Sequence, residues 1–250
     1  MTYCVGVLVQ EGLVLIADTR TNAGIDNVAI YKKLHVFEQP GERIVALATA
    51  GNLAISQAVV SLMTDGWENP DTGHVETIYD HPTMFKTAQY VGRSIREVYR
   101  IDGKNLEQSA GSFDVAMLLA GQVAGGRLRL FMVYSAGNFI EAAEDTPFLQ
   151  IGEHKYGKPI LDRAIKFTTP IPDAFKISLI SMDSTMRSNL GVGMPIDALT
   201  IRRDSLERDI HVRIEPGEPY FHDLRERWSA ALRAAHTAIP VPPYHGKEPL

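Results

Sequence analysis

Thr2 follows the first methionine of the chain, in the stretch Met1-Thr2-Tyr3-Cys4-Val5. Removal of Met1 would leave a threonine that carries both a hydroxyl nucleophile and a free α-amine. Such an amine has an ordinary pKa of about 7.7 to 8.0 and can accept the hydroxyl proton as a general base. Because many chains begin with Met-Thr, the pair alone is weak evidence, and a catalytic role requires partner residues elsewhere in the chain.

Two charged residues lie at the ends of strands predicted soon after the N-terminus. Apolar runs at residues 5–9 and 13–17, separated by a turn, predict a β-hairpin. Asp18 ends the second strand, where an antiparallel neighbour brings it level with the chain terminus. Lys33 opens a further predicted strand within the run 30–37.

These charges suit the activation of a threonine hydroxyl. Lys33 would stabilise the developing alkoxide and hold the terminal amine neutral. Asp18 would anchor the Lys33 ammonium through a charge-assisted hydrogen bond, and Arg20 would brace the local loop. The alternative for Lys33 is a solvated lysine at a strand end, which is the interpretation that we favour for its neighbour Lys32.

Gly51 ends another apolar run, which starts at Arg43, and Asn52 follows as the predicted N-cap of a helix over residues 53–63. A glycine between a strand and a helix lets a backbone N–H approach a developing oxyanion, and the helix N-terminus adds positive potential. The alternative is an ordinary turn glycine. The link with Thr2 favours the oxyanion role.

The order of these residues resembles the proteasome-type β-subunits of the N-terminal-nucleophile hydrolase superfamily. Thr2 matches the terminal threonine, Asp18 and Arg20 the Asp-x-Arg at a strand end, Lys33 the catalytic lysine and Gly51 the oxyanion-hole glycine. The Thr-Tyr-Cys-Val-Gly start and the segments 16–24 and 181–190 are most similar to the bacterial ancestral β-subunit group, called Anbu. The resemblance covers about residues 2 to 236.

The resemblance implies further site residues in the second half of the chain. It assigns Asp183 and Ser188, in or beside a helix predicted by apolar spacings of three and four, to positioning the terminal amine. The alternative for Asp183 is an ion pair with Arg187 at i, i+4. Family peptidases carry a supporting serine in a turn where this sequence has Gly-Glu-His. Glu153 or His154 would replace that serine, or the support is lost.

The implied fold is α+β, a four-layer αββα sandwich of two antiparallel sheets flanked by helices. The predicted strands and paired helices agree with that layering. We expect one proteasome-type domain over residues 1–236, with Met1 removed, and a Pro-rich C-terminal extension over residues 237–250. The prolines exclude helix from the extension and favour an extended arm.

Three functions stay open at this point. The first is a threonine-type peptidase subunit, in which Thr2 attacks an amide bond of a peptide or protein and water hydrolyses the acyl ester. The second is an assembly subunit with a vestigial or very narrow activity, and the third is an amide hydrolase or transferase acting on a small peptide-like product. Joint retention of Thr2, Asp18 and Lys33 favours the first. The resemblance implies a homo-oligomer, a ring or a spiral, and no sequence feature names an ATPase or operon partner.

Composition excludes several other classes. The chain has 250 residues, of which 45% are hydrophobic, enough for one substantial core. A net charge of −5 without a basic stripe argues against nucleic acid. No apolar run reaches the length of a membrane span, and no secretory signal is visible. The lone Cys4 excludes an internal disulfide and suits a reducing cytoplasm.

Metal and cofactor motifs are also missing from the sequence. The eight histidines show no His-Glu-x-x-His spacing and have no cysteine pairs beside them. Gly191-x-Gly193 is too short for a dinucleotide fingerprint, and no Gly-Lys-Ser/Thr loop exists. We therefore expect neither a metal nor a cofactor.

Overall fold

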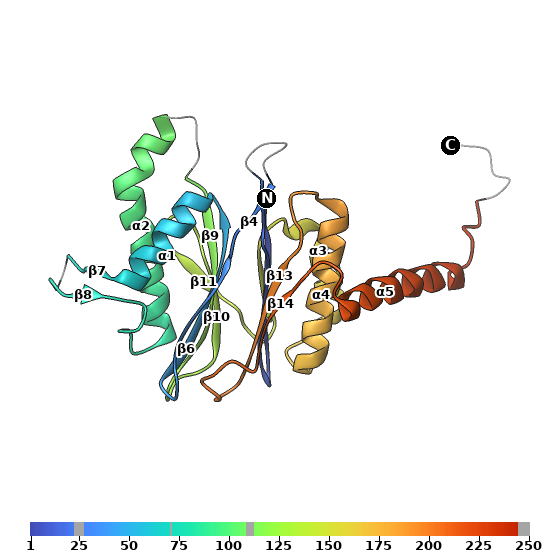
Figure 1. The fold of residues 1–250 in the computed structure, drawn as a ribbon. Coiled ribbons are helices and arrows are strands. Elements are labelled where there is room, and N and C mark those ends of the chain that lie inside the picture. Colours follow the sequence, from blue (N-terminus) through green and yellow to red (C-terminus); the bar gives the residue numbers. More distant parts are fainter. Residues whose placement is uncertain (23–27, 71, 109–112, 245–250) are drawn as a thin grey trace. The chain divides into compact units, whose positions relative to one another are not determined.

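A computed structural model of the chain describes residues 1–22, 28–70, 72–108 and 113–244. The chain divides into two compact units, Met1–Pro216 and Gly217–Leu250, which are described separately below. The first unit contains both large sheets and four helices (Figure 1).

The first sheet of this unit has the order β12-β1-β2-β13-β14, with every neighbouring pair antiparallel. Its strands are β1 (Tyr3–Val9), β2 (Gly12–Asp18), β12 (Phe148–Gly152), β13 (Ile196–Arg202) and β14 (Ile210–Ile214). The predicted hairpin near the N-terminus is confirmed, because Cys4 pairs with Ala17 and Val9 with Gly12. Every residue of both hairpin strands is buried, as their unbroken apolar runs suggest.

The second sheet has the order β11-β10-β9-β6-β5 and is also antiparallel. Its strands are β5 (Leu34–Gln39), β6 (Arg43–Gly51), β9 (Val115–Val123), β10 (Arg129–Val133) and β11 (Phe139–Glu141). Two short ribbons add β3 (Arg20–Asn22) with β4 (Val28–Ile30), and β7 (Trp67–Glu68) with β8 (Val75–Glu76). The strand predicted to open at Lys33 is β5, which begins one residue later at Leu34, and Ile30 belongs to the separate strand β4. The division arises because β4 pairs with β3, outside the large sheet.

Four helices cover the outer faces of these two sheets (Figure 1). They are α1 (Leu53–Asp65), α2 (Met84–Gln108), α3 (His154–Ala164) and α4 (Ile171–Ser188). Helices α1 and α2 pack on β6, β9 and β10, whereas α3 and α4 pack on β12, β1 and β2. The helix predicted around Asp183 is confirmed as α4, which ends when Asn189 takes an extended backbone conformation.

The core follows from the alternation of side chains along the strands. Buried residues such as Leu13 and Leu15 of β2 meet Ala46 and Ala48 of β6 in a cluster between the two sheets. A second cluster lies between the second sheet and α1 and α2, with Val59 and other apolar side chains of those helices. A mixed α and β fold with antiparallel sheets is thus confirmed, and it leaves Thr2, Asp18 and Gly51 at strand ends.

The second unit consists mainly of α5 (Pro219–Ala238). The Glu218 carboxylate caps it by accepting hydrogen bonds from the backbone N–H groups of Tyr220 and Phe221. The helix ends two residues beyond the predicted domain boundary at 236, and the domain division stays a prediction. Within the described residues, no helix is both long and apolar enough to cross a membrane.

Candidate active site

Thr2 lies immediately before β1, and its backbone is held by the strand on its other side. The Thr2 carbonyl accepts a hydrogen bond from the Glu153 N–H at 2.8 Å. Gly152 has a φ of +79°, and a Cβ built on it would come within 2.0 Å of the Thr2 oxygen. Only glycine allows this close approach. Thr2 as a whole is 7% exposed.

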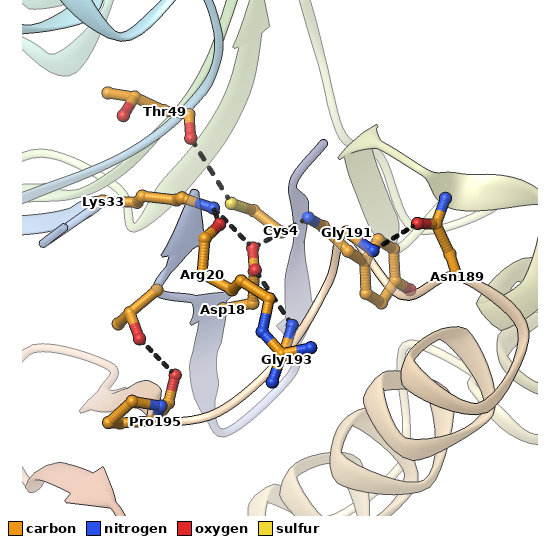
Figure 2. A network of polar contacts seen from close by, with 11 residues as sticks. Cys4, Asp18, Arg20, Lys33, Thr49, Asn189, Gly191, Gly193 and Pro195 are labelled. Atoms are coloured by element: carbon orange, nitrogen blue, oxygen red, sulfur yellow. Dashed lines mark hydrogen bonds and ion pairs between the residues drawn. The ribbon is translucent and has the colours of Figure 1, made fainter. Parts of the chain in front are cut away.

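Asp18 and Lys33 form an ion pair beside Thr2, and Figure 2 shows the Lys33 side chain directed at the Asp18 carboxylate. Lys33 Nζ donates to Asp18 Oδ1 at 2.9 Å and to the Arg20 carbonyl at 2.5 Å. The two side chains are only 4% and 0% exposed. The next residue after Thr2 completes the link, because the Tyr3 N–H donates to Asp18 Oδ1 at 3.0 Å. The predicted anchoring of Lys33 by Asp18 is therefore present in the structure.

The Asp18 carboxylate receives donors on both oxygens. Gly193 N–H donates to Oδ2 at 3.2 Å, in addition to the two donors on Oδ1. Burial raises the pKa of Asp18, while the Lys33 ammonium and the Tyr3 and Gly193 N–H groups oppose that shift. Because a proton on either oxygen would face a donor, the hydrogen-bond geometry favours the ionised carboxylate.

Arg20 braces the loop that follows α4. Its Nη1 donates to the Leu190 carbonyl at 3.0 Å, and a Cβ on Gly193 would come within 2.3 Å of its Cζ. The guanidinium therefore lies flat against a glycine of the loop that also supplies the Gly193 N–H to Asp18. This matches the bracing role expected for Arg20.

Gly51 joins β6 to α1 with a φ of +102°. A Cβ there would come within 2.3 Å of the Asp114 carbonyl oxygen, so the strand pairing with β9 admits only glycine. Asn52 caps α1 as predicted, since its Oδ1 accepts from the N–H groups of Ala54 and Ile55. Gly51 thus stands exposed at the positive end of a helix.

A cavity of about 420 Å³ brings these parts together. Thr2, Lys33 and Gly51 all line it, although they come from three different segments of the chain. The remaining lining is mostly neutral: Met1, Thr21, Ala29, Tyr31, Thr49, Ala50, Asn52, Leu53 and Ser56. Met1 is 64% exposed at this cavity, and a Cβ on Gly191 would meet its side chain at 2.5 Å.

Asp183 and Ser188 lie on α4, outside the set of residues that line this cavity. The Asp183 side chain is 1% exposed and accepts from Arg187 Nε at 3.0 Å. The i, i+4 ion pair of the alternative interpretation is therefore present. Ser188 is exposed at the last position of the helix. A role for either residue at the terminal amine stays a prediction.

The turn that lacks a serine contacts Thr2 through its backbone. Glu153 supplies its N–H to Thr2, whereas its side chain makes no capping bond at the start of α3. His154 Nδ1 lies 3.1 Å from the Gly152 carbonyl. The backbone of this turn supports Thr2, whatever the role of the Glu153 carboxylate.

Sequence reasoning missed two backbone donors to Asp18, those of Tyr3 and Gly193. The Gly191-x-Gly193 pattern was visible, but only as a failed dinucleotide fingerprint. Its glycines have a packing reason, because Gly191 accommodates Met1 and Gly193 accommodates Arg20. Within the described residues, no group of three or more His, Cys, Asp or Glu residues could hold a metal ion.

Comparison with known proteins identifies the family. No protein-family model and no curated protein matches the chain. Among solved structures, an Anbu (Gly-1) mutant from Hyphomicrobium sp. strain MC1 matches with 46% identity and a TM-score of 0.88, over 96% of this chain and 99% of that one.

Two further structures agree with this match. Anbu (ancestral β-subunit) from Yersinia bercovieri is 41% identical with a TM-score of 0.87, and covers 96% of this chain and 98% of its own. A structure described as the helical assembly of the Anbu complex from Pseudomonas aeruginosa is 42% identical with a TM-score of 0.88, over the same shares. The chain therefore belongs to the Anbu family of proteasome-like ancestral β-subunits.

Proposed function

We propose that this chain is a threonine amidohydrolase of the peptidase type, with Thr2 as its nucleophile once Met1 has been removed. The single observation that carries the proposal is the cavity shared by Thr2, Lys33 and Gly51. An alkyl hydroxyl needs a nearby cation or base, a fixed position and an oxyanion donor. These three residues supply those parts from separate strand ends.

The proposed reaction begins with the amine that Met1 removal exposes. That amine takes the Thr2 hydroxyl proton while Oγ attacks the carbonyl carbon of an amide bond. Gly51 N–H stabilises the oxyanion of the tetrahedral intermediate, together with the N-terminus of α1. The carbon–nitrogen bond then breaks, the leaving amine receives the proton, and an acyl ester remains on Thr2.

Water completes the cycle. The free amine of Thr2 accepts a proton from a water molecule, whose oxygen attacks the acyl ester, and the carboxylic acid product leaves with Thr2 restored. Lys33 lowers the energy of the alkoxide in both halves of the reaction. Its position is supported by the Asp18 and Arg20 oxygens, which hold Nζ at 2.9 and 2.5 Å.

Three further residues are assigned supporting roles within this proposal. Asp183 and Ser188 position the terminal amine, and Glu153 replaces the missing serine through its backbone N–H, supported by the 2.8 Å bond to the Thr2 carbonyl. We further propose the four-layer αββα sandwich of N-terminal-nucleophile hydrolases as the fold, supported by two packed sheets with helices on both outer faces.

We also propose that the subunit works in a cytoplasmic homo-oligomer, a ring or spiral, acting on peptides or proteins. The helical assembly of the Pseudomonas aeruginosa relative supports the oligomer. The free, buried Cys4 thiol suits a reducing compartment. No residue in the described part of the chain points to a particular ATPase or operon partner.

The experiment that tests the proposal has two steps. Intact-mass measurement first establishes whether Met1 has left, and a threonine-directed electrophile is then added to the processed protein. We expect one adduct per chain in the native protein, none in Thr2→Ala, and an adduct again in Thr2→Ser, which retains a hydroxyl. A processed protein that stays unmodified while remaining folded and assembled would indicate the vestigial-subunit alternative.

A further inference from the structure

A second cavity lies along β12, the strand that ends directly before the Glu153 N–H bonded to Thr2. Its volume is about 590 Å³, and its lining includes residues 145–152, which contain the whole of β12. The two cavities adjoin at a pair of sheet neighbours, since Ala50 lines the first and its partner Ala116 lines the second. Gly152, whose neighbour Glu153 bonds to Thr2, lies at the same junction. We name the second cavity the β12 edge groove.

The strand beside this groove has an unpaired side. Among the described strands, β12 pairs only with β1 and stands at the edge of its sheet. The bonds from Glu153 N–H to Thr2 and from Leu8 N–H to Pro147 mark the positions that bond across to β1. Because antiparallel ladders alternate, the peptide groups of Phe148, Gln150 and Gly152 face the other way. The Gly152 carbonyl already lies 3.1 Å from His154 Nδ1, so the positions open to a further strand are those of Phe148 and Gln150.

The chemistry of the groove suits an extended chain with apolar side chains. Edge strands with unpaired peptide groups can accept a further strand. Met132, Ile151 and Ile165 line the groove, and the charge of Lys158 is already paired with Asp162 at 2.6 Å. The occupant therefore needs backbone hydrogen-bonding groups and apolar side chains more than it needs charge.

We propose that the β12 edge groove binds the part of a peptide substrate on the amine side of the scissile bond, as a strand added to β12. The inference rests on the proposed threonine amidohydrolase function. The first cavity then holds the acyl side, Thr2 lies between the two, and the departing amine leaves along the groove. The substrate is accordingly a peptide with several residues beyond the cleaved bond, rather than a small amide.

The test compares two variants at one position, Phe148→Pro and Phe148→Ala. Both remove the ring, but only proline also removes the N–H that faces the free edge, and an edge strand tolerates proline there. Each variant is assayed with two peptides that share an acyl side. One carries a single aromatic amide as leaving group, and the other carries four apolar residues.

We expect the ratio of kcat/KM for the long peptide to that for the short one to be lower in Phe148→Pro than in Phe148→Ala, by about five- to tenfold, since one backbone hydrogen bond is lost. Circular dichroism and thermal unfolding check that both variants are folded. Equal ratios in the two folded variants would overturn the inference. Equal kcat/KM values of the native protein for the long and the short peptide would overturn it as well.

The design separates this inference from the proposed function. If the native protein forms no Thr2 adduct, the proposed function fails, and the groove assignment fails with it. If the adduct forms and the ratio is unchanged, only the groove assignment fails. A change of oligomeric state in Phe148→Pro, with an unchanged ratio, would instead mean that another copy of the chain occupies the edge.

Discussion

Two ion pairs of this chain have similar lengths and very different surroundings. The Asp18–Lys33 pair spans 2.9 Å with side chains 0% and 4% exposed, and Asp18 accepts two further backbone bonds. The Asp183–Arg187 pair spans 3.0 Å; its Asp183 side chain is only 1% exposed, but its Arg187 side chain is 49% exposed. The first pair joins segments held by sheet pairing, and the second joins two turns of one helix.

The difference shows that an ion pair contributes according to how fully its charges are enclosed. An enclosed carboxylate without its partner is a buried, uncompensated charge, whereas a partly exposed pair is screened by water. Enclosure also holds Lys33 in one position beside Thr2, as the proposed reaction requires. Four measurements can break or sharpen this comparison.

The largest effect is expected from Lys33→Met. The substitution keeps an unbranched side chain but leaves the Asp18 charge without its cation, so the free energy of unfolding should fall by about 3 to 5 kcal/mol. Acylation of Thr2 should slow by about 10²- to 10⁴-fold. Denaturant unfolding and adduct formation followed by mass measure the two quantities. A variant as stable as the native protein would remove the distinction between the pairs.

The next effect concerns pH. It tests whether the loss of stability in acid comes from a group outside the two ion pairs. Burial, assisted by the charge of Lys32, lowers the pKa of His35 to about 4. Because the ordinary value is about 6.5, the unfolded chain binds the proton more readily, and stability present above pH 6.5 is lost as the pH falls towards 4. The loss at this site is at most about 3 kcal/mol.

His35→Gln should therefore reduce the slope of stability against pH between about 6.5 and 4. Burial also lowers the pKa of His81 and of His211, so part of the slope should remain. Urea unfolding at several pH values provides the measurement. An identical slope in the variant would show that other groups, including the two aspartate pairs, cause the loss of stability in acid.

A smaller loss of stability is expected from Asp18→Asn, because the Lys33 ammonium keeps its hydrogen bond to the Arg20 carbonyl and lines the cavity. The amide nitrogen would face a donor, either the Gly193 N–H or the pair from Lys33 and Tyr3, at a cost of about 1 to 3 kcal/mol. Acylation should nevertheless fall by at least about tenfold, because the Lys33 ammonium loses its anchor. An unchanged acylation rate in a folded Asp18→Asn variant would show that enclosure alone positions Lys33.

The smallest effect is expected from Arg187→Ala. The Asp183 carboxylate is buried, but it has contacts besides Arg187, and water screens the half-exposed Arg187 charge. The Arg187 side chain should therefore contribute about 0.3 to 1 kcal/mol, and added salt should reduce that difference further. Thermal unfolding at low and high ionic strength measures it. A loss as large as that of Lys33→Met, or a loss of acylation without a loss of stability, would instead support the role at the terminal amine that the resemblance assigns to Asp183.

Local signals allowed much of the fold to be predicted. Apolar runs marked both hairpin strands, Asn52 was identified as the cap of α1, and the Asp183–Arg187 pair was one of the two interpretations of Asp183. The prediction was less exact at residues 30–37, where the strand expected to open at Lys33 begins at Leu34 and Ile30 ends the separate strand β4. The pairing of β4 with β3 outside the large sheet has no local signature, so the sequence of this segment alone could not reveal where β4 ends and β5 begins.

By itself, the sequence determined which residue types stand at the strand ends and which family they resemble, because strand periodicity, capping and i, i+4 spacing depend on near neighbours. Only the tertiary structure decided the surroundings of those residues. The donors to Asp18 come from 15 and 175 positions away, and the unpaired side of β12 is an edge only because of the strand order. Sheet register and strand order set such contacts, and they arise when the whole core packs.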